Sequence, residues 1–352
     1  MSRKNILIIF AAIIGIHILV VSAIVRSNHS PQKESVPAAG KNPGTEKVEK
    51  TAVQNDPPPP PAVKKTEPET PGKIKPFIYA EKVALPADLH KQSRRARSGI
   101  LVDLNNRKVL WSKRAKHPVA VASLTKLMTA LLIAEKMEKD PDFKWKKTIK
   151  ITDAAVNVER SCVLGMKKDE VYILGELMQS MMINSHNDSA VQLAEEYSGD
   201  VGKFVEIMNF SAHQRGMTST RFNSPNGLPQ GKKRINSFAS AEDITHICEE
   251  LIKYPRVMQL CTMRSARLHT GRRVYSHNNL LLGPTKRNPK RRPVEGLIGF
   301  KTGFTNAAGS CLAFGVKRNG RTIIGCVTGF PSAADRDNFC RGVIEWAYRK
   351  NK

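Results

Sequence analysis

Hydrophobic and polar positions divide the chain into three stretches of different character. The first is an almost unbroken apolar run, Ile6–Val25. The second, residues 27–76, has few large apolar side chains and is rich in proline, including an unbroken run at Pro57–Pro61. From residue 77 onward, apolar residues recur at the spacings typical of strands and helices. The pattern therefore predicts one folded domain at residues 77–352, preceded by two segments of a different kind.

The first segment has the length of a membrane span. The run Ile6–Val25 covers roughly 30 Å at about 1.5 Å per residue, which matches the hydrocarbon core of a bilayer. Arg3 and Lys4 precede it, so the positive-inside tendency leaves the amino terminus in the cytoplasm. We predict a single-pass membrane anchor at residues 1–26, with the remainder on the periplasmic or extracytoplasmic side. A cleaved signal peptide is the alternative, because Val21-Ser22-Ala23 offers small residues for cleavage.

The proline-rich segment at residues 27–76 is predicted to be a disordered stalk. Its few apolar residues cannot offset the entropy that ordering would remove. Its prolines favour extended polyproline conformations. Such a segment would hold the folded domain away from the membrane.

Within residues 77–352, strand patterns lie at the two ends and helical patterns lie between them. Strands are expected at 98–104, 108–112, 297–305, 310–316 and 322–328, and helices at 123–135, 173–180, 189–197, 201–215, 241–252 and 335–349. Asn319-Gly320 predicts a tight hairpin between the last two strands. The economical arrangement is an α+β domain, with one antiparallel sheet built from both ends of the domain, helices on its faces and a helical lobe.

The chain carries 57 Lys and Arg against 31 Asp and Glu, a formal net charge of +26. Such a balance favours anionic partners, and proteins that bind nucleic acid neutralise phosphates in this way. Because the domain is expected outside the cytosol, no nucleic-acid partner is predicted. Basic residues crowd at 286–292 and 232–234. These groups are either solvated loops or sites that attract anionic lipid head groups, wall polymers or substrates ending in carboxylates.

Cysteine usage leaves two interpretations open. The six cysteines lie in the part of the chain expected to be exported, where disulfides persist. The alternative is burial as small apolar side chains, because each has apolar neighbours in the sequence. No CxxC or Cys/His spacing indicates a metal, and neither a metal nor a cofactor is expected. The residues are Cys162, Cys248, Cys261, Cys311, Cys326 and Cys340.

Candidate chemistry begins at Ser123-Leu124-Thr125-Lys126, at the start of a predicted helix. Positions i and i+3 share a helix face, so the lysine amine can lie beside the serine hydroxyl. A desolvated lysine with a lowered pKa can serve as the base that activates a serine nucleophile. Taken alone, the spacing also fits a helix-capping serine followed by a surface lysine.

Two further groups have the same ambiguity. Ser185-His186-Asn187 lies between two predicted helices, where it can relay a proton and hold a substrate amide, or simply cap the second helix. Lys301-Thr302-Gly303 lies inside a predicted strand, although lysine and glycine are depleted in strands. There the lysine and threonine can bind an anion and the glycine permits close approach. A bulged edge strand is the alternative.

Together and in this order, the three groups resemble the motifs of penicillin-binding proteins and related serine enzymes. From about residue 96 to about residue 329 the chain is similar to the serine D-alanyl-D-alanine carboxypeptidases, the low-molecular-mass penicillin-binding proteins. The resemblance implies the fold that β-lactamases and transpeptidases share. It extends to Pro118, Ala122–Thr129, Ser185–Ala190, Phe222–Leu228 and Asn278–Leu281.

The resemblance implies catalytic roles for four residues. Ser123 would attack the carbonyl between two D-alanines of a peptidoglycan stem peptide, with Lys126 as its base. Ser185 and Asn187 would relay the proton and orient the substrate amide. Water would then release the shortened peptide, and β-lactams would acylate the same serine as covalent inhibitors.

The resemblance also implies a substrate-binding strand. Lys301, Thr302 and Gly303 would receive the carboxylate end of the substrate, and the backbone N–H groups of Ser123 and Phe304 would form an oxyanion hole. Some relatives bind the carboxylate with an arginine where this chain has His277, so we expect recognition to depend more on the lysine and threonine.

Two other departures qualify the resemblance. His186 occupies a position where the family commonly has a small residue; it is expected either to face solvent, or to trim the cleft or titrate near neutral pH. Many relatives add a β-rich domain and a carboxy-terminal anchor. The chain ends soon after the strand that carries Lys301, so we expect the amino-terminal anchor and stalk to provide the tether.

Three alternatives to a carboxypeptidase stay open at this point. A β-lactamase on the same scaffold would need a deacylating glutamate, for which Glu195 and Glu196 are the candidates. A DD-endopeptidase would use the same motifs on cross-links. A non-catalytic wall-binding module would use only the groove and would have no need of the serine and both lysines.

Overall fold

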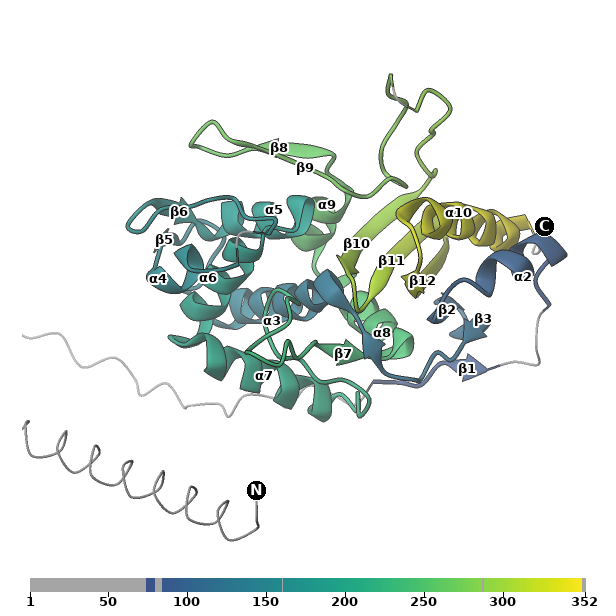
Figure 1. Ribbon diagram of the computed structural model, residues 1–352, viewed down its shortest axis with the longest axis horizontal. Helices are drawn as coiled ribbons and strands as arrows, with labels where there is room; N and C mark the ends of the chain where they lie inside the picture. The colour runs from purple at the N-terminus through teal and green to yellow at the C-terminus, as the bar shows by residue number, and fades with distance from the viewer. Residues whose placement is uncertain (1–73, 80–83, 160, 287, 350–352) are drawn as a thin grey trace, which may run out of the picture. The chain divides into compact units, whose positions relative to one another are not determined.

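The computed structural model describes residues 74–79, 84–159, 161–286 and 288–349 (Figure 1). The predicted anchor, and all but the last three residues of the predicted stalk, lie outside these ranges. None of the helices within the ranges is long and apolar enough to cross a bilayer.

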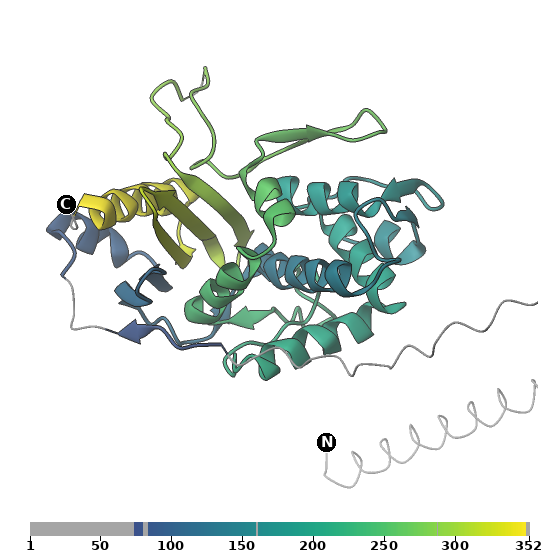
Figure 2. The same cartoon turned by 180° about the vertical axis from the view of Figure 1, so that it is seen from behind.

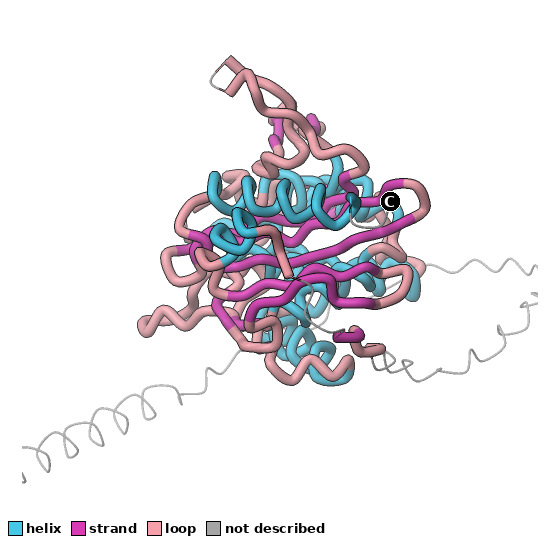
Figure 3. Tube along the Cα trace, turned by 90° about the vertical axis from the view of Figure 1, so that its right-hand side faces the viewer, coloured by secondary structure: helices cyan, strands magenta, loops and turns pink. Residues whose placement is uncertain are grey.

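A six-stranded sheet joins the two ends of the domain. Its strands follow the order β1-β3-β2-β12-β11-β10, and β2 pairs antiparallel with β12 along Ser98–Asp103 and Ile323–Thr328 (Figure 3). The prediction of a sheet built from both ends is confirmed, with the addition of β1, which pairs parallel with β3. The strands are β1 (Ile78–Tyr79), β2 (Ser98–Asp103), β3 (Lys108–Lys113), β10 (Leu297–Thr305), β11 (Gly309–Arg318) and β12 (Arg321–Phe330).

The sheet separates two apolar cores because side chains alternate between its faces. In β2, Ile100 and Val102 belong to one core and Leu101 to the other, and all three are fully buried. Helices α8 (Ala241–Leu251) and α9 (Pro255–Thr262) pack on the first face. Helices α2 (Ala87–Ser93) and α10 (Ala333–Arg349) cover the second (Figures 1 and 2). The result is a sheet buried on both faces.

A helical lobe extends the first core and carries three short strand pairs. The predicted helices are confirmed within a few residues at their ends, whereas α2, α4, α9 and the short pairs were not predicted. The helices are η1 (Ala122–Thr125), α3 (Lys126–Lys139), α4 (Asp153–Val156), α5 (Leu174–Asn184), α6 (Asn187–Ser198) and α7 (Val201–Gln214). The pairs join β4 (Val119–Ala120) to β7 (Phe238–Ala239), β5 (Thr148–Lys150) to β6 (Val171–Ile173), and β8 (Ser265–Arg267) to β9 (Arg273–Tyr275).

All six cysteines are free thiols. Five are buried, and only Cys162 is exposed. Burial raises the pKa of buried thiols such as Cys311, to about 11, so these side chains stay protonated. Burial as small apolar side chains is therefore the interpretation that the structure supports.

Replacing Phe339 tests the second core. This α10 side chain has no exposed surface, and its ring centroid lies 5.0 Å from that of Trp111 and 5.6 Å from that of Phe330. We expect Phe339→Ala to lower the free energy of unfolding by about 3–5 kcal/mol through lost burial and a cavity. The control Phe210→Ala removes a 61% exposed ring and should cost less than about 0.5 kcal/mol. Urea unfolding measures both, and equal losses would contradict the packing described.

Candidate active site

The candidate nucleophile lies in a tight turn between the short strand β4 and helix α3. Ser123 is the second residue of η1, and Lys126 is the first residue of α3. Ala122, directly before the serine, has a positive φ of 48°, a conformation that a non-glycine residue adopts only when its surroundings enforce it. The turn places Lys126 Nζ 3.0 Å from Ser123 Oγ. The structure thus brings together the pair that the i, i+3 spacing predicts.

The Lys126 amine is completely buried and has three hydrogen-bond partners. Ser123 Oγ lies 3.0 Å from it, and the amine donates to Asn187 Oδ1 at 2.7 Å and to the carbonyl oxygen of Asn226 at 2.7 Å. Burial lowers the pKa of Lys126 well below its usual range, and the positive charge of Lys301 lowers it further. The amine is therefore held in an environment that favours its neutral form.

A neutral amine matches these three partners. It has two N–H donors and one lone pair, and two of its partners, the Asn187 amide oxygen and the Asn226 carbonyl oxygen, can only accept. The lone pair is then left for the Ser123 hydroxyl, which can donate its proton to Lys126 Nζ. This arrangement can activate the serine as a nucleophile.

The Ser185-His186-Asn187 group lies at the junction of α5 and α6, as predicted. Ser185 ends α5 with a positive φ of 68°, and Asn187 begins α6. The amide of Asn187 donates from Nδ2 to the Ser161 carbonyl and accepts from Lys126 at Oδ1. Ser185 is buried beside them, but its hydroxyl makes no hydrogen bond to another described residue. A substrate could therefore engage this hydroxyl.

A loop at residues 161–165 holds Asn187 in place, and sequence reasoning missed it. The backbone N–H of Asn187 donates to the Cys162 carbonyl at 2.8 Å. Asp188 fastens the same loop by accepting from the backbone N–H groups of Leu164 and Gly165 at 3.0 and 2.9 Å. These contacts use backbone atoms, so no side-chain pattern marks them in the sequence.

The expectations that His186 faces solvent or titrates near neutral pH are wrong, and a role in trimming the cleft stays a prediction. The side chain is buried rather than turned to solvent, and its Nδ1 lies 2.8 Å from Ser180 Oγ. Burial lowers the pKa of His186 to about 4, so the ring is neutral near pH 7 and does not titrate there. Ser180 in turn accepts from Ser189 Oγ, which places the histidine in a buried polar network between α5 and α6.

The strand β10 carries the second lysine to the edge of the nucleophile turn. Burial lowers the pKa of Lys301 to about 8, and its amine donates to the Thr302 carbonyl at 3.1 Å. Gly303 allows the approach: a Cβ at this position would lie 3.2 Å from the backbone nitrogen of Ser123. A side chain at this position would crowd the backbone of η1, and the glycine permits the close contact between β10 and η1.

The remaining predicted residues surround this contact. Thr302 is partly exposed, and the Phe304 side chain is 62% exposed at the end of β10. His277 is exposed as a residue, with Nε2 3.5 Å from Asn184 Nδ2 at the end of α5. The atoms packed around its ring lower the pKa of His277, and the charge of Lys301 lowers it further. His277 is thus neutral in the free protein near pH 7.

The turn at residues 224–228 is the second feature that sequence reasoning did not assign. It supplies the Asn226 carbonyl to Lys126, and its Pro225 carbonyl accepts from Thr129 Oγ1 at 2.7 Å. Gly227 has a φ of 83°, and a Cβ there would lie 2.0 Å from the carbonyl oxygen of Ala122. The turn is therefore packed directly against the backbone of the nucleophile turn.

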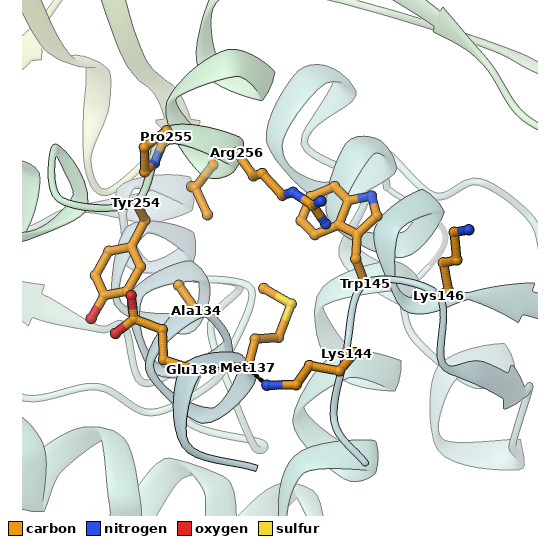
Figure 4. Close-up of a pocket in the computed structure, with 10 residues that line it drawn as sticks. Ala134, Met137, Glu138, Lys144, Trp145, Lys146, Tyr254, Pro255 and Arg256 are labelled. Atoms are coloured by element: carbon orange, nitrogen blue, oxygen red, sulfur yellow. Dashed lines mark hydrogen bonds between the residues drawn. The ribbon is translucent and has the colours of Figure 1, made fainter. Parts of the chain in front are cut away.

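An apolar pocket of about 480 Å³ lies away from the candidate active site (Figure 4). Trp145 and Tyr254 line opposite sides of it, and Arg256 lies 5.9 Å from the Trp145 ring centroid. Met137 reaches this pocket from the end of α3 opposite Lys126. None of the predicted site residues lines it, so it is separate from the candidate active site.

Replacing Gly227 tests the packing of this turn. Gly227→Ala and Gly231→Ala both introduce a side chain at positive φ, which costs about 1–2 kcal/mol. Only the new side chain of Gly227→Ala also collides with backbone atoms, because nothing lies within 4 Å of a Cβ at Gly231. We expect Gly227→Ala to cost about 1–3 kcal/mol more in free energy of unfolding, as overpacking does. Denaturant titration of both variants measures the difference, and equal costs would mean that the turn can move freely.

A family model described as D-alanyl-D-alanine carboxypeptidase matches residues 86–332. The chain is 29% identical over 253 residues to D-alanyl-D-alanine carboxypeptidase DacF of Bacillus subtilis, covering 72% of this chain and 62% of that protein. It is 30% identical over 230 residues to the D-alanyl-D-alanine endopeptidase of Escherichia coli, covering 64% of this chain and 68% of that protein. The match thus spans less than two thirds of the Bacillus relative.

Solved structures give the same result for the fold. The chain superposes on PBP3 of Streptococcus pneumoniae with a TM-score of 0.64 at 26% identity, over 72% of this chain and 73% of that one. It superposes on Penicillin-Binding Protein D2 of Listeria monocytogenes, in the cefotaxime-bound form, with a TM-score of 0.61 at 25% identity, over 71% and 96%. The fold is that of penicillin-binding proteins, as predicted. The chain belongs to the D-alanyl-D-alanine carboxypeptidase family.

Proposed function

We propose that the chain is a serine DD-carboxypeptidase, which removes the terminal D-alanine from peptidoglycan stem peptides through an acyl-enzyme on Ser123. One observation carries the proposal. The buried Lys126 amine lies 3.0 Å from Ser123 Oγ, and its two N–H donors have carbonyl acceptors in Asn187 and Asn226. Family membership supports this reaction, and the geometry supports Lys126 as the base and Ser123 as the nucleophile.

Acylation begins with transfer of the Ser123 hydroxyl proton to Lys126 Nζ. The serine oxygen attacks the carbonyl carbon between the two D-alanines, and the carbonyl oxygen becomes an oxyanion. The backbone N–H groups of Ser123 and Phe304 would stabilise that charge. The proton then passes from Lys126, through the Ser185 hydroxyl, to the leaving amine. The C–N bond breaks, D-alanine departs and the peptide remains as an ester on Ser123.

Deacylation repeats these steps with water as the nucleophile. Lys126, neutral again, accepts a proton from water, and the resulting hydroxide attacks the ester carbonyl. Collapse of the second tetrahedral intermediate breaks the C–O bond to Ser123. The lysine returns its proton to the serine oxygen, and the shortened peptide leaves with a new carboxylate.

Recognition of the terminal carboxylate falls to the β10 edge. With a pKa of about 8, Lys301 is charged at neutral pH and can pair with an anion. The Thr302 hydroxyl adds a donor, and Gly303 lets the substrate backbone lie against the strand. His277 would contribute as a neutral hydrogen-bond donor near pH 7.

The three alternatives to a carboxypeptidase differ in how well the observations support them. For a β-lactamase, neither glutamate on α6 is placed as a deacylating base: Glu195 accepts from Thr152, and Glu196 Oε1 lies 3.4 Å from Lys147 Nζ. A DD-endopeptidase is the second candidate, because relatives in Escherichia coli and Pseudomonas aeruginosa carry that name. A non-catalytic module would not need a desolvated lysine beside the serine.

The proposed setting follows the sequence pattern. Residues 1–26 would anchor the chain in the bacterial cell membrane, residues 27–76 would form the stalk, and residues 77–352 the catalytic domain. The domain would act on the periplasmic or extracytoplasmic side. β-Lactams would bind covalently at Ser123, a proposal supported by the cefotaxime-bound Listeria relative.

Replacing the nucleophile tests the proposal. Wild-type chain exposed to benzylpenicillin should gain one covalent adduct on Ser123 by mass spectrometry and should release D-alanine from a stem pentapeptide. Ser123→Ala should lose the adduct and at least about 10⁴-fold in kcat/KM, since the nucleophile is gone. The control Ser219→Ala should keep both. D-Alanine release by the Ser123→Ala variant would contradict the mechanism. If the wild type cleaved cross-linked dimers in preference to the pentapeptide, the endopeptidase alternative would be favoured.

The pKa of Lys301 predicts the alkaline side of the pH profile. Its amine is charged below about pH 8, so kcat/KM for a carboxylate substrate should fall as the pH rises through that value. Lys301→Arg keeps the charge and should move this fall to higher pH, whereas Lys301→Gln should lower kcat/KM and remove the fall.

The exposed Lys317 on β11 offers a control, since Lys317→Arg should leave the profile unchanged. Thermal unfolding shows whether each Lys301 variant is folded. A fall near pH 8 that persists in a folded Lys301→Gln variant would assign it to another group.

A further inference from the structure

The positive charge of the chain is concentrated in one segment. Between Glu250 and Glu295 the sequence contains no Asp or Glu. The same stretch holds Lys253, Arg256, Arg264, Arg267, Arg272, Arg273, Lys286, Arg287, Lys290, Arg291 and Arg292. It leads directly into β10, the strand of the candidate active site.

Two projections built from this segment rise from the same side of the domain. One is the β8–β9 hairpin and the other is the loop at residues 283–293, which precedes β10 (Figures 1 and 3). The loop is closed at its base by a hydrogen bond from the Val294 N–H to the Leu280 carbonyl at 2.7 Å. Together they present six exposed cations, which we call the basic surface: Arg264, Arg267, Arg273, Lys286, Lys290 and Arg292.

The hairpin holds two of these cations against their mutual repulsion. Arg267 and Arg273 are directly opposite each other in the β8–β9 pair, a placement that destabilises a hairpin when the charges are alike. The burial of Val274 on the other face of the hairpin offsets the cost of this repulsion. At the tip, His269 is tied to Glu176 by its backbone N–H at 2.6 Å and its ring at 2.8 Å. The structure thus maintains an unfavourable charge pair.

Some exposed cations of the domain form ion pairs with carboxylates, as in Lys150–Asp169 at 3.0 Å and Arg234–Glu159 at 3.0 Å. Within the described residues, no cation of the basic surface forms an ion pair with a carboxylate. A group of positive charges without carboxylate partners, two of them directly opposite each other, attracts anions from solution.

We propose that the basic surface binds a linear polyanion of the cell wall, a polymer that carries a phosphate or carboxylate on each repeat. Charges spread over two projections suit an extended polymer rather than a single ion. The exposed Tyr275, 55% accessible and opposite Ser265, adds a ring on which a sugar unit can pack. Bound polymer would run beside β10, along the edge where Lys301 lies. The proposal is independent of the proposed hydrolysis.

Two observations favour a wall polymer over a membrane. The sheet order places β1, near the start of the described chain, at one edge and β10 at the other. In Figure 1 the two projections lie at the top of the domain and β1 lies at the bottom. Membrane-surface binding also needs a band of apolar side chains. Among the described residues of this segment, Tyr275 is the one large apolar side chain with high exposure.

Salt-dependent binding tests the proposal. Full-length chain in detergent is titrated with long-chain polyphosphate and, separately, with polygalacturonate, at several salt concentrations. The test variant combines Arg267→Gln, Arg273→Gln, Lys286→Gln and Lys290→Gln. It should bind at least about tenfold more weakly at about 0.1 M salt, with a log–log salt slope shallower by about 2–3, since each lost contact removes about 0.7. The tighter probe identifies the anion as phosphate or carboxylate.

A matched variant separates this surface from overall charge. Lys91→Gln, Lys108→Gln, Lys139→Gln and Lys203→Gln remove the same charge from exposed positions elsewhere. This control should bind as the wild type does, and both variants should still be acylated by benzylpenicillin at the wild-type rate. Equal weakening in the control, or tighter binding to phosphatidylglycerol vesicles or duplex DNA than to both wall-type polyanions, would overturn the proposal.

Discussion

The burial of the Lys126 amine is the constraint on which the rest of the site depends. A lysine without exposed surface is tolerated only when its polar atoms are satisfied. Its partners come from distant parts of the chain: Asn187 is 61 residues away and Asn226 is 100 residues away. The start of α6 and the turn at 224–228 must therefore meet the start of α3 in one place. The same contacts that make the lysine tolerable also hold its amine against Ser123.

Backbone groups, more than side chains, hold this arrangement. The loop at 161–165 fixes Asn187 through two carbonyl oxygens and is itself fastened by Asp188. Gly227 and Gly303 let two other segments approach the backbone of the nucleophile turn; a side chain at Gly227 would collide with the Ala122 carbonyl, and one at Gly303 would crowd the Ser123 nitrogen. Two segments of the chain thus pack directly against the nucleophile turn, in which Ala122 has a positive φ of 48°.

The regular elements and the motif residues could be predicted from the sequence because each has a local signal. The strand predicted at residues 297–305 has the bounds of β10, and the helical spacing predicted α3 and α7 within a few residues of their ends. The carbonyl of Asn226 and the loop at 161–165 have no such signal, since any residue carries a carbonyl and only the tertiary fold decides where it points. His186 was misjudged for the same reason: a histidine before a helix is usually solvated, and its burial against Ser180 depends on how α5 and α6 pack. The short helix α9 has only two turns of pattern, too few to separate it from a loop.

In the proposed mechanism the two buried lysines take opposite charge states, neutral for Lys126 and charged for Lys301, and their coupling links binding to catalysis. Lys301, with a pKa of about 8, is charged near neutral pH, and that charge is one cause of the lowered pKa of Lys126. A substrate carboxylate beside Lys301 would cancel much of this charge. The pKa of Lys126 would then rise, which makes the neutral amine a stronger base when the scissile bond is in place. If the pKa of Lys126 rose too far, the amine would be protonated before the reaction and could not act as a base. The lowering of this pKa by burial must therefore be larger than the rise that the bound substrate causes. Burial lowers the pKa of Lys126 more than the charge of Lys301 does, as the proposed mechanism requires.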